Sequence, residues 1–167
     1  MKPNILPLAL LLAACVAPAR LPPAHDRPIF DPIAFFAGPT EGTGSLNIVL
    51  KAAQAIRVHG TGRMEGGSTL VLDQTVESDG KPDERRQWRI TRTADGYTGV
   101  LSDADGPVRI EVNGARLHLA YRAKAGGFGV EQWLDLAADG RSADNILIFR
   151  KFGFRVARLT ETIRKAG

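Results

Sequence analysis

A series of tight-turn signals between residues 66 and 140 limits the folds that this chain can adopt. Each joins a glycine to an aspartate, an asparagine or a second glycine, the residues that reach the positive φ angles of tight β-hairpins. The seven signals are Gly66-Gly67, Asp79-Gly80, Asp95-Gly96, Asp105-Gly106, Asn113-Gly114, Gly126-Gly127 and Asp139-Gly140. Because the turns separate short segments, and the ends of the chain can add one or two more, the spacing predicts about eight to ten strands.

The segments between these turns alternate apolar and polar residues. The apolar sets that share one face are Leu70, Leu72 and Val76; Trp88 and Ile90; Val108, Ile110 and Val112; and Leu117, Leu119 and Tyr121. The residues between them, such as Asp73, Arg89 and Glu111, are mostly polar. A period of two with one apolar face is typical of antiparallel strands that cover a core.

Consecutive hairpins favour an all-β, up-and-down antiparallel meander that closes into a barrel, because closure removes the exposed sheet edges. A sandwich of two sheets is the alternative. A barrel of eight strands has an interior that holds either packed side chains or one small ligand.

The first residues resemble the signal sequence of a bacterial lipoprotein. Lys2 precedes an apolar run from Ile5 to Ala14, which is about half the length of a membrane-spanning helix. The run closes with Leu12-Ala13-Ala14-Cys15, which resembles a lipobox. This resemblance implies that Cys15, the only cysteine, carries the lipid. Because Val16 and not an aspartate follows Cys15, the resemblance also implies a location at the periplasmic face of the outer membrane. The alternative is an ordinary signal peptide cut near Ala17-Pro18-Ala19.

The chain therefore divides into a signal peptide over residues 1–14, a lipid anchor with a proline-rich tether over 15–28, and a barrel domain over 29–167. The tether contains four prolines and shows no apolar periodicity, so we expect it to be extended and loosely held. In the segment that follows, Asp31 can cap a helical turn with Pro32 at its first position. Phe30, Phe35 and Phe36 would then plug one end of the barrel.

Composition and motifs argue against several classes of function. The net charge of +4 is scattered, and the sequence shows no basic helix, so we predict no nucleic-acid partner. His25, His59 and His118 lack metal-like spacing, and no Gly-x-Ser-x-Gly motif is present. We therefore predict no enzyme, no catalytic residues, no metal and no cofactor.

Six residues are candidates for a ligand site: Gln74, Arg86, Trp88, Tyr121, Trp133 and Lys151. Gln74 and Arg86 have the same parity as the apolar face, and a buried polar group needs a partner or a ligand head group. In one interpretation the six line the mouth of a cavity that takes an acyl chain. In the alternative, Arg86 and Lys151 close the barrel ends by bonding loop carbonyls, and the aromatic residues fill the core.

The landmarks resemble an uncharacterised family of bacterial lipoproteins, classed as a domain of unknown function, with a lipocalin-like (calycin) barrel. They are Phe30-Asp31-Pro32, Phe35-Phe36-x-Gly38, Leu70-x-Leu72-Asp73, Arg86-x-Trp88-Arg89-Ile90, Tyr97-x-Gly99, Tyr121, Trp133-Leu134, Asn145 and Lys151-Phe152-Gly153-Phe154. Gln74 and Gln132 stand where relatives more often carry acidic residues. The resemblance implies a fold and a location but no activity.

Together these observations predict an outer-membrane lipoprotein whose barrel binds a small apolar or lipid ligand, such as a fatty acid or a phospholipid fragment. The alternative is a structural or assembly lipoprotein with a filled barrel and no ligand. The membrane partner would be reached through the N-terminal lipid.

Overall fold

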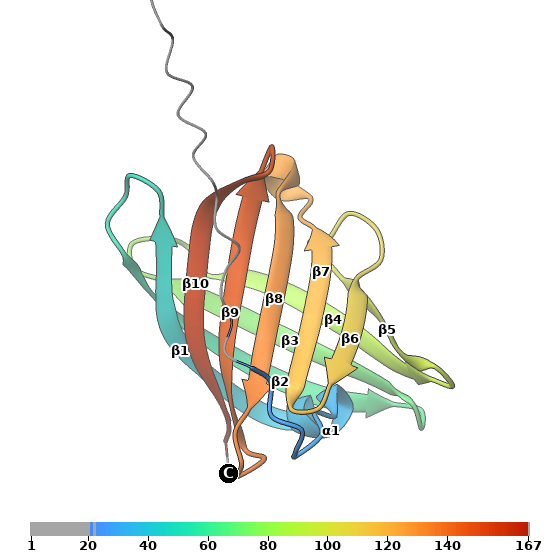
Figure 1. Cartoon of the computed structure of the whole chain (residues 1–167). Helices are drawn as coiled ribbons and strands as arrows, with labels where there is room; N and C mark the ends of the chain where they lie inside the picture. Colours follow the sequence, from blue (N-terminus) through green and yellow to red (C-terminus); the bar gives the residue numbers. More distant parts are fainter. Residues whose placement is uncertain (1–20, 22, 167) are drawn as a thin grey trace, which may run out of the picture.

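The computed structural model describes residue 21 and residues 23–166, and ten antiparallel strands form most of it (Figure 1). The elements are α1 (Pro32–Phe36), β1 (Gly38–Ile48), β2 (Gln54–Glu65), β3 (Thr69–Ser78), β4 (Glu84–Thr93), β5 (Gly96–Leu101), β6 (Arg109–Asn113), β7 (Arg116–Arg122), η1 (Ala125–Gly127), β8 (Gly129–Leu136), β9 (Ser142–Lys151) and β10 (Phe154–Lys165). The sheet order is β5-β4-β3-β2-β1-β10-β9-β8-β7-β6. The all-β meander is confirmed, and the single sheet rules out the two-sheet sandwich.

Each of the seven predicted turns occurs where two consecutive strands are connected, although Gly96 and Asn113 are themselves strand-end residues. In six of the seven signals the second residue is a glycine with a positive φ. In the remaining one, Gly66-Gly67, the first glycine has the positive φ. Two further hairpins carry no such signal. The β1–β2 connection turns at Leu50 and the β9–β10 connection turns at Phe152-Gly153.

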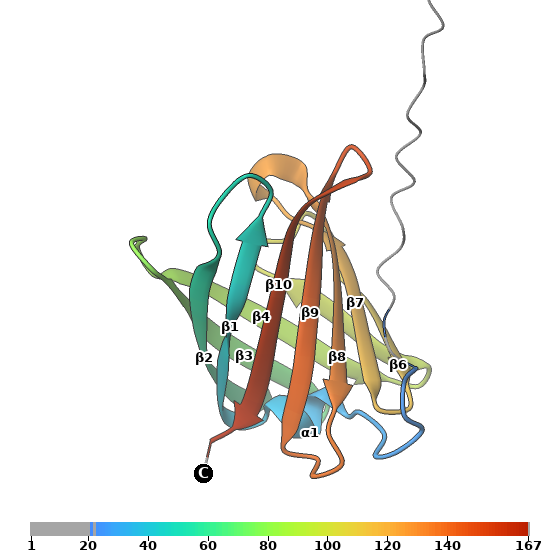
Figure 2. The same cartoon turned by 60° about the vertical axis from the view of Figure 1, so that its left-hand side comes forward.

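The two ends of the sheet meet at a seam between β5 and β6 (Figure 1). In Figure 2 the paired strands β1 and β10 face the viewer instead. In the described part of the chain, the backbone pairing across this seam is the single bridge between Gly99 and Val108. A Cβ atom on Gly99 would lie 2.5 Å from Cδ1 of Ile110, so the glycine lets the Ile110 side chain pack across the seam. Nine ladders of paired strands and one narrow junction, the bridge between Gly99 and Val108, therefore close the barrel.

Helix α1 closes one end of the barrel, as the three phenylalanines predict (Figure 1). Asp31 is its N-cap and accepts hydrogen bonds from the backbone N–H groups of Ile33 and Ala34, at 3.0 and 3.3 Å. At the other end of the helix, Lys165 Nζ donates to the carbonyl oxygens of residues 34, 35 and 37. A cation at a helix C-terminus satisfies carbonyls that have no partner within the helix. The last strand thus holds the plug in place.

The packed core lies between α1 and the middle of the barrel. Its fully buried members include Phe30, Leu70, Leu101, Leu117 and Leu134. Trp88 and Ile90 of β4 belong to the same cluster. This half of the barrel is filled with side chains.

The last residues before the barrel are not all loosely held, contrary to the expectation for the tether. The backbone N–H of Ala115 donates to the carbonyl oxygen of His25 at 2.7 Å. The predicted signal peptide and the lipidation site Cys15 lie outside the described residues. Within the described residues, no helix combines the length and hydropathy needed to cross a lipid bilayer.

Candidate functional site

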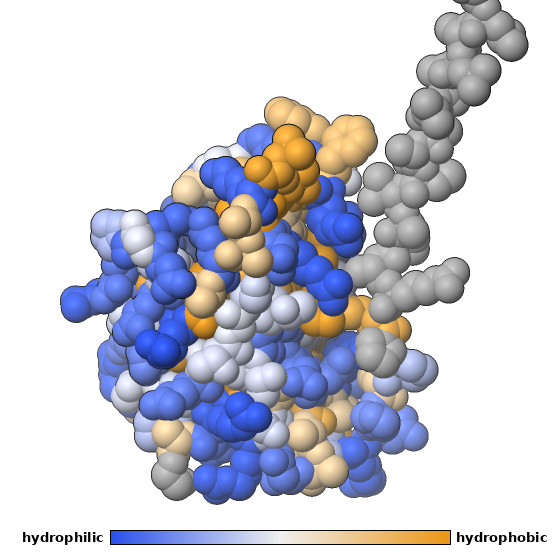
Figure 3. All heavy atoms as spheres, turned by 90° about the vertical axis from the view of Figure 1, so that its left-hand side faces the viewer, coloured by the Kyte–Doolittle hydropathy of each residue, from blue (hydrophilic) through white to orange (hydrophobic). Residues whose placement is uncertain are grey.

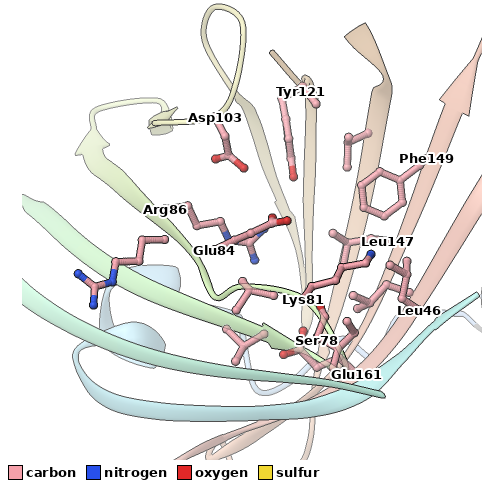
Figure 4. A pocket seen from close by; sticks show the side chains of 17 residues that line it. Leu46, Ser78, Lys81, Glu84, Arg86, Asp103, Tyr121, Leu147, Phe149 and Glu161 are labelled. Carbon is pink, nitrogen blue, oxygen red and sulfur yellow. The ribbon is translucent and has the colours of Figure 1, made fainter. Parts of the chain in front are cut away.

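A cavity of about 440 Å³ occupies the half of the barrel opposite α1 (Figure 4). It is lined by Leu46, Ile56, Val58, Val76, Ser78, Lys81, Glu84, Arg85, Arg86, Asp103, Tyr121, Ala123, Val130, Leu147, Phe149, Leu159 and Glu161. Its volume falls within the range of about 300–1,000 Å³ that is usual for small-molecule sites. The barrel is therefore filled at one end and hollow at the other.

The cavity has an apolar side and a polar side. Leu46, Leu147 and Phe149 of β1 and β9 line one side, while Arg86 and Tyr121 face them from β4 and β7 (Figure 4). Such a lining suits a molecule that is itself apolar over part of its length and polar at one end.

The polar floor of the cavity begins with Gln74, whose side-chain oxygen accepts two hydrogen bonds. Arg86 Nε donates to Gln74 Oε1 at 2.9 Å, and Trp88 Nε1 donates to the same atom at 3.0 Å. The pairing register places Gln74 of β3 directly opposite Arg86 of β4. The Trp88 ring meets Tyr121 edge to face, with centroids 5.9 Å apart. Gln74 thus fixes the orientation of both the guanidinium and the indole.

A second group of polar side chains completes the floor from the opposite wall. Asn145 of β9 donates to Glu161 Oε2 of β10 at 2.8 Å, and Gln132 of β8 donates to Asn145 Oδ1 at 3.1 Å. Glu161 is only 8% exposed, and burial raises the pKa of its carboxyl group, although the Asn145 hydrogen bond and the charge of Arg86 oppose the rise. A protonated carboxyl can donate a hydrogen bond as well as accept one.

Gly42 makes the space that Glu161 occupies. A Cβ atom at residue 42 would lie 1.8 Å from Glu161 Oε1, and one at Gly44 would lie 2.9 Å from the Glu161 Cβ. Neither distance is compatible with an unchanged side chain. The two glycines of β1 therefore allow a carboxyl group to lie against the barrel wall.

Two floor atoms, Gln132 Oε1 and Glu161 Oε1, have no hydrogen-bond partner among the described residues. Both side chains border a void of about 20 Å³ below the main cavity, together with Gln74, Arg86 and Asn145. A void of this size holds one water molecule where polar partners surround it. The floor can thus accept an ordered water or a ligand atom.

The buried carboxyl group of Glu161 predicts a pH dependence of stability. Because its pKa is raised above the ordinary value of 4.5, its stabilising contribution is complete below pH 4.5 and is lost as the pH rises through the folded pKa. Glu161→Gln stays neutral, so its free energy of unfolding should rise relative to the wild type above about pH 4.5. Urea denaturation of both proteins across this range measures the difference, with Glu41→Gln on the exposed face of β1 as control. Parallel pH profiles for all three proteins would contradict the prediction.

Four of the six predicted site residues come together. Gln74, Arg86, Trp88 and Tyr121 form one connected group at the cavity floor. Arg86 bonds a side chain here and not a loop carbonyl, so the alternative in which it closes the barrel end is wrong. Arg86 and Tyr121 line the cavity, whereas Gln74 and Trp88 lie beneath it beside the smaller void.

The structure does not bring Trp133 and Lys151, the other two candidates, to the cavity. Trp133 lies on the outer face of β8, where its ring stacks on His118 with centroids 5.1 Å apart. Its neighbours Gln132 and Leu134 point inward instead. Lys151 ends β9 and donates to the carbonyl oxygen of Gly126, as the alternative role for this lysine proposed. Trp133 faces outward because of its position in the alternation of β8. Lys151 lies outside the barrel interior because it is the last residue of β9.

Gln132, Asn145 and Glu161 belong to the floor but were not among the six candidates. Of these three, Glu161 lines the main cavity. It alternates with Leu159 and Ile163 along β10, so the same parity that selected Gln74 would have selected it. Among the described residues, no three His, Cys, Asp or Glu side chains lie close enough to hold a metal ion.

Comparison with known proteins identifies the family. A family model described as "Protein of unknown function (DUF3833)" matches residues 9–165. The chain belongs to this family. The resemblance to a family of unknown function is thereby confirmed, and a comparison of the DUF3833 chain with curated proteins finds no match.

Among solved structures, the DUF3833 barrel is similar to the S-type phycobiliprotein lyase CPES from Guillardia theta. The TM-score is 0.54 and the sequence identity is 8%, over 81% of this chain and 90% of the lyase chain. At this identity the likeness concerns the fold alone. It agrees with the predicted calycin-like barrel.

Proposed function

We propose that this DUF3833 protein is a lipid-anchored binding barrel that holds a molecule with an acyl chain and an anionic head group. The observation that carries the proposal is the cavity with an apolar side and Arg86, Tyr121 and Glu161 on its floor. A fatty acid has the matching chemistry, with a hydrocarbon chain for the apolar side and a carboxylate for the floor.

Three groups on the floor can donate hydrogen bonds to a carboxylate. Arg86 supplies a guanidinium that Gln74 holds through Nε, which leaves its two terminal nitrogens directed elsewhere. Burial raises the pKa of the Tyr121 hydroxyl, which keeps it protonated. Burial also favours the protonated form of Glu161. A guanidinium with two neutral donors favours an anion over a neutral or cationic head group.

A structural or assembly role is the second candidate, and the filled half of the barrel favours it. Phe30, Leu70 and Leu134 are packed there as in a protein with no ligand. Such a role does not require the cavity in the other half of the barrel. We therefore place ligand binding first. The lyase likeness supports only the fold, so we propose binding without catalysis.

Replacement of Arg86 tests the head-group role. Arg86→Ala should weaken the binding of a fatty acid about ten- to a hundredfold, because hydrogen bonds to a charged group are worth roughly 1.5–3 kcal/mol. Titration of palmitate, followed by Trp88 emission in a Trp133→Phe background, measures the affinity. Arg89→Ala is the matched control, since Arg89 lies on the outer face of the same strand and pairs with Glu65.

Saturable binding that is equal in the two arginine variants would remove Arg86 from the site. No binding of any apolar probe by the wild-type protein would favour the structural role. Native mass spectrometry of protein purified gently from membranes supplies an independent measurement, because a co-purified acyl lipid identifies the occupant.

The proposed anchor is Cys15, supported by the sequence Leu12-Ala13-Ala14-Cys15 that precedes the tether. Two or three acyl chains on one residue hold a protein stably on a membrane, whereas one chain does so only marginally. We propose the periplasmic face of the outer membrane as the location.

Palmitate labelling tests this anchor. Cys15→Ser should abolish incorporation of the label and should remove the processed protein from the outer-membrane fraction. Incorporation by Cys15→Ser at the wild-type level would refute the assignment.

A further inference from the structure

Large apolar side chains are exposed on two neighbouring hairpins at the open end of the barrel. Val49 and Leu50 lie in the β1–β2 connection, Phe152 lies in the β9–β10 turn, and Phe154 is the first residue of β10. Leu50 is fully exposed and Phe152 is 89% exposed. Figure 3 shows hydrophobic side chains gathered at the end of the molecule away from the C-terminal end of β10. These four residues form an apolar rim beside the cavity mouth.

The backbone at the two hairpin tips is strained in order to present these side chains. Leu50 and Phe152 have φ angles of 63° and 51°, and they are the non-glycine residues with positive φ in the described part of the chain. Bulky residues rarely adopt this conformation, which glycine and asparagine reach more easily. Strain at an exposed apolar residue serves no packing, so it points to a role at the surface.

The segments that form this side of the mouth are basic. Residues 47–53, 122–130 and 150–158 contain no Asp or Glu. Their cations are Lys51, Arg122, Lys124, Arg150, Lys151, Arg155 and Arg158. The neighbouring β3–β4 connection differs, since residues 79–84 contain three acidic side chains and one lysine. The positive charge is thus concentrated on the three segments at residues 47–53, 122–130 and 150–158.

Contacts between the hairpins hold the rim together. The backbone N–H of Val49 donates to the carbonyl oxygen of Val156 at 3.0 Å. The ammonium group of Lys151 bonds Gly126 and lies 5.3 and 5.2 Å from the ring centres of Phe128 and Phe152. The three segments therefore present one continuous surface.

We propose that the apolar rim inserts into an anionic lipid bilayer and docks the open end of the barrel on the membrane. Apolar tips that enter the acyl region, surrounded by cations at the level of the head groups, are the features that bind proteins to lipid surfaces. Single projecting tips without a groove suit a fluid surface better than a folded protein. Docking by the rim is separate from the proposed anchor at Cys15, and it places the cavity mouth against the membrane.

Site-specific labelling distinguishes this orientation from adhesion through the N-terminal segment. A polarity-sensitive probe is attached to Leu50→Cys or to Met64→Cys in the full chain carrying Cys15→Ser. Met64 is an exposed apolar residue at the end of β2 nearer α1. With vesicles of phosphatidylglycerol and phosphatidylcholine, the probe at 50 should shift to the blue and be quenched by brominated acyl chains, whereas the probe at 64 should not. Equal responses, or no response at 50, would overturn the proposal.

A double variant separates docking from folding. Leu50→Asn with Phe152→Asn relieves the strain, so its unfolding temperature should be unchanged or higher, while its vesicle affinity should fall about tenfold or more. Met64→Asn with Val100→Asn is the matched control and should bind as the parent does. A fall in stability, unchanged affinity, or equal binding to pure phosphatidylcholine would overturn the proposal. So would binding to a protein partner that the variant abolishes while vesicle binding persists.

Discussion

Trp88→Ala should lower the free energy of unfolding by about 3–5 kcal/mol, the range for removing a large aromatic side chain from a packed core. The indole is 4% exposed, belongs to the main core cluster and donates a hydrogen bond to Gln74. Its loss leaves a cavity and also removes the aromatic contact with Tyr121. Chemical denaturation followed by far-UV circular dichroism measures the change.

Trp133→Ala is the control for this prediction, because Trp133 lies on the outer face and stacks on His118. We expect it to cost about 1 kcal/mol, as is common for a partly exposed side chain. Similar costs for the two variants would mean that Trp88 is not held in a packed core. A cost below about 1 kcal/mol for Trp88→Ala would have the same meaning.

Gly62→Ala should destabilise the protein by about 3 kcal/mol, the upper end of the range for overpacking. A Cβ atom at this position would lie 1.9 Å from the carbonyl oxygen of Phe36 and 3.1 Å from Leu70 Cδ1. A backbone carbonyl cannot rotate away as a flexible side chain can, so α1 must shift from the barrel end. Thermal and urea denaturation measure the loss.

Gly67→Ala in the adjacent turn is the matched control. Its added Cβ would meet no atom within 4 Å, so its stability should change by no more than about 0.5 kcal/mol. Equal stability of the two alanine variants would show that the helix does not depend on the close approach at Gly62.

The fold could be predicted because its signals are local. An Asp-Gly or Asn-Gly pair sets a hairpin by backbone conformation alone, and strand parity then assigns the inward face. The turns at Leu50 and Phe152 give no such signal, because leucine and phenylalanine do not favour the positive φ that these residues adopt. The family resemblance added the calycin-like shape that the meander alone did not specify.

The candidate site could be predicted only in part, because pairing between distant strands decides which inward polar groups meet. Parity selected Gln74 and Arg86, and the register then placed them opposite each other. The same parity excludes Trp133, which was chosen for its residue type. Glu161 comes to the floor through the pairing of β10 with β1 and depends on the space above Gly42. No local pattern reveals that close approach.

The narrow junction between β5 and β6 is also the place where we expect the sheet of this barrel to open first. Separating these strands breaks one backbone bridge, whereas separating β6 from β7 breaks a ladder of five residue pairs. Regions with few backbone hydrogen bonds open at lower free energy than the rest of a structure. This junction can therefore open without global unfolding, and amide protons at Gly99 and Val108 should exchange with solvent before those of the β9–β10 ladder.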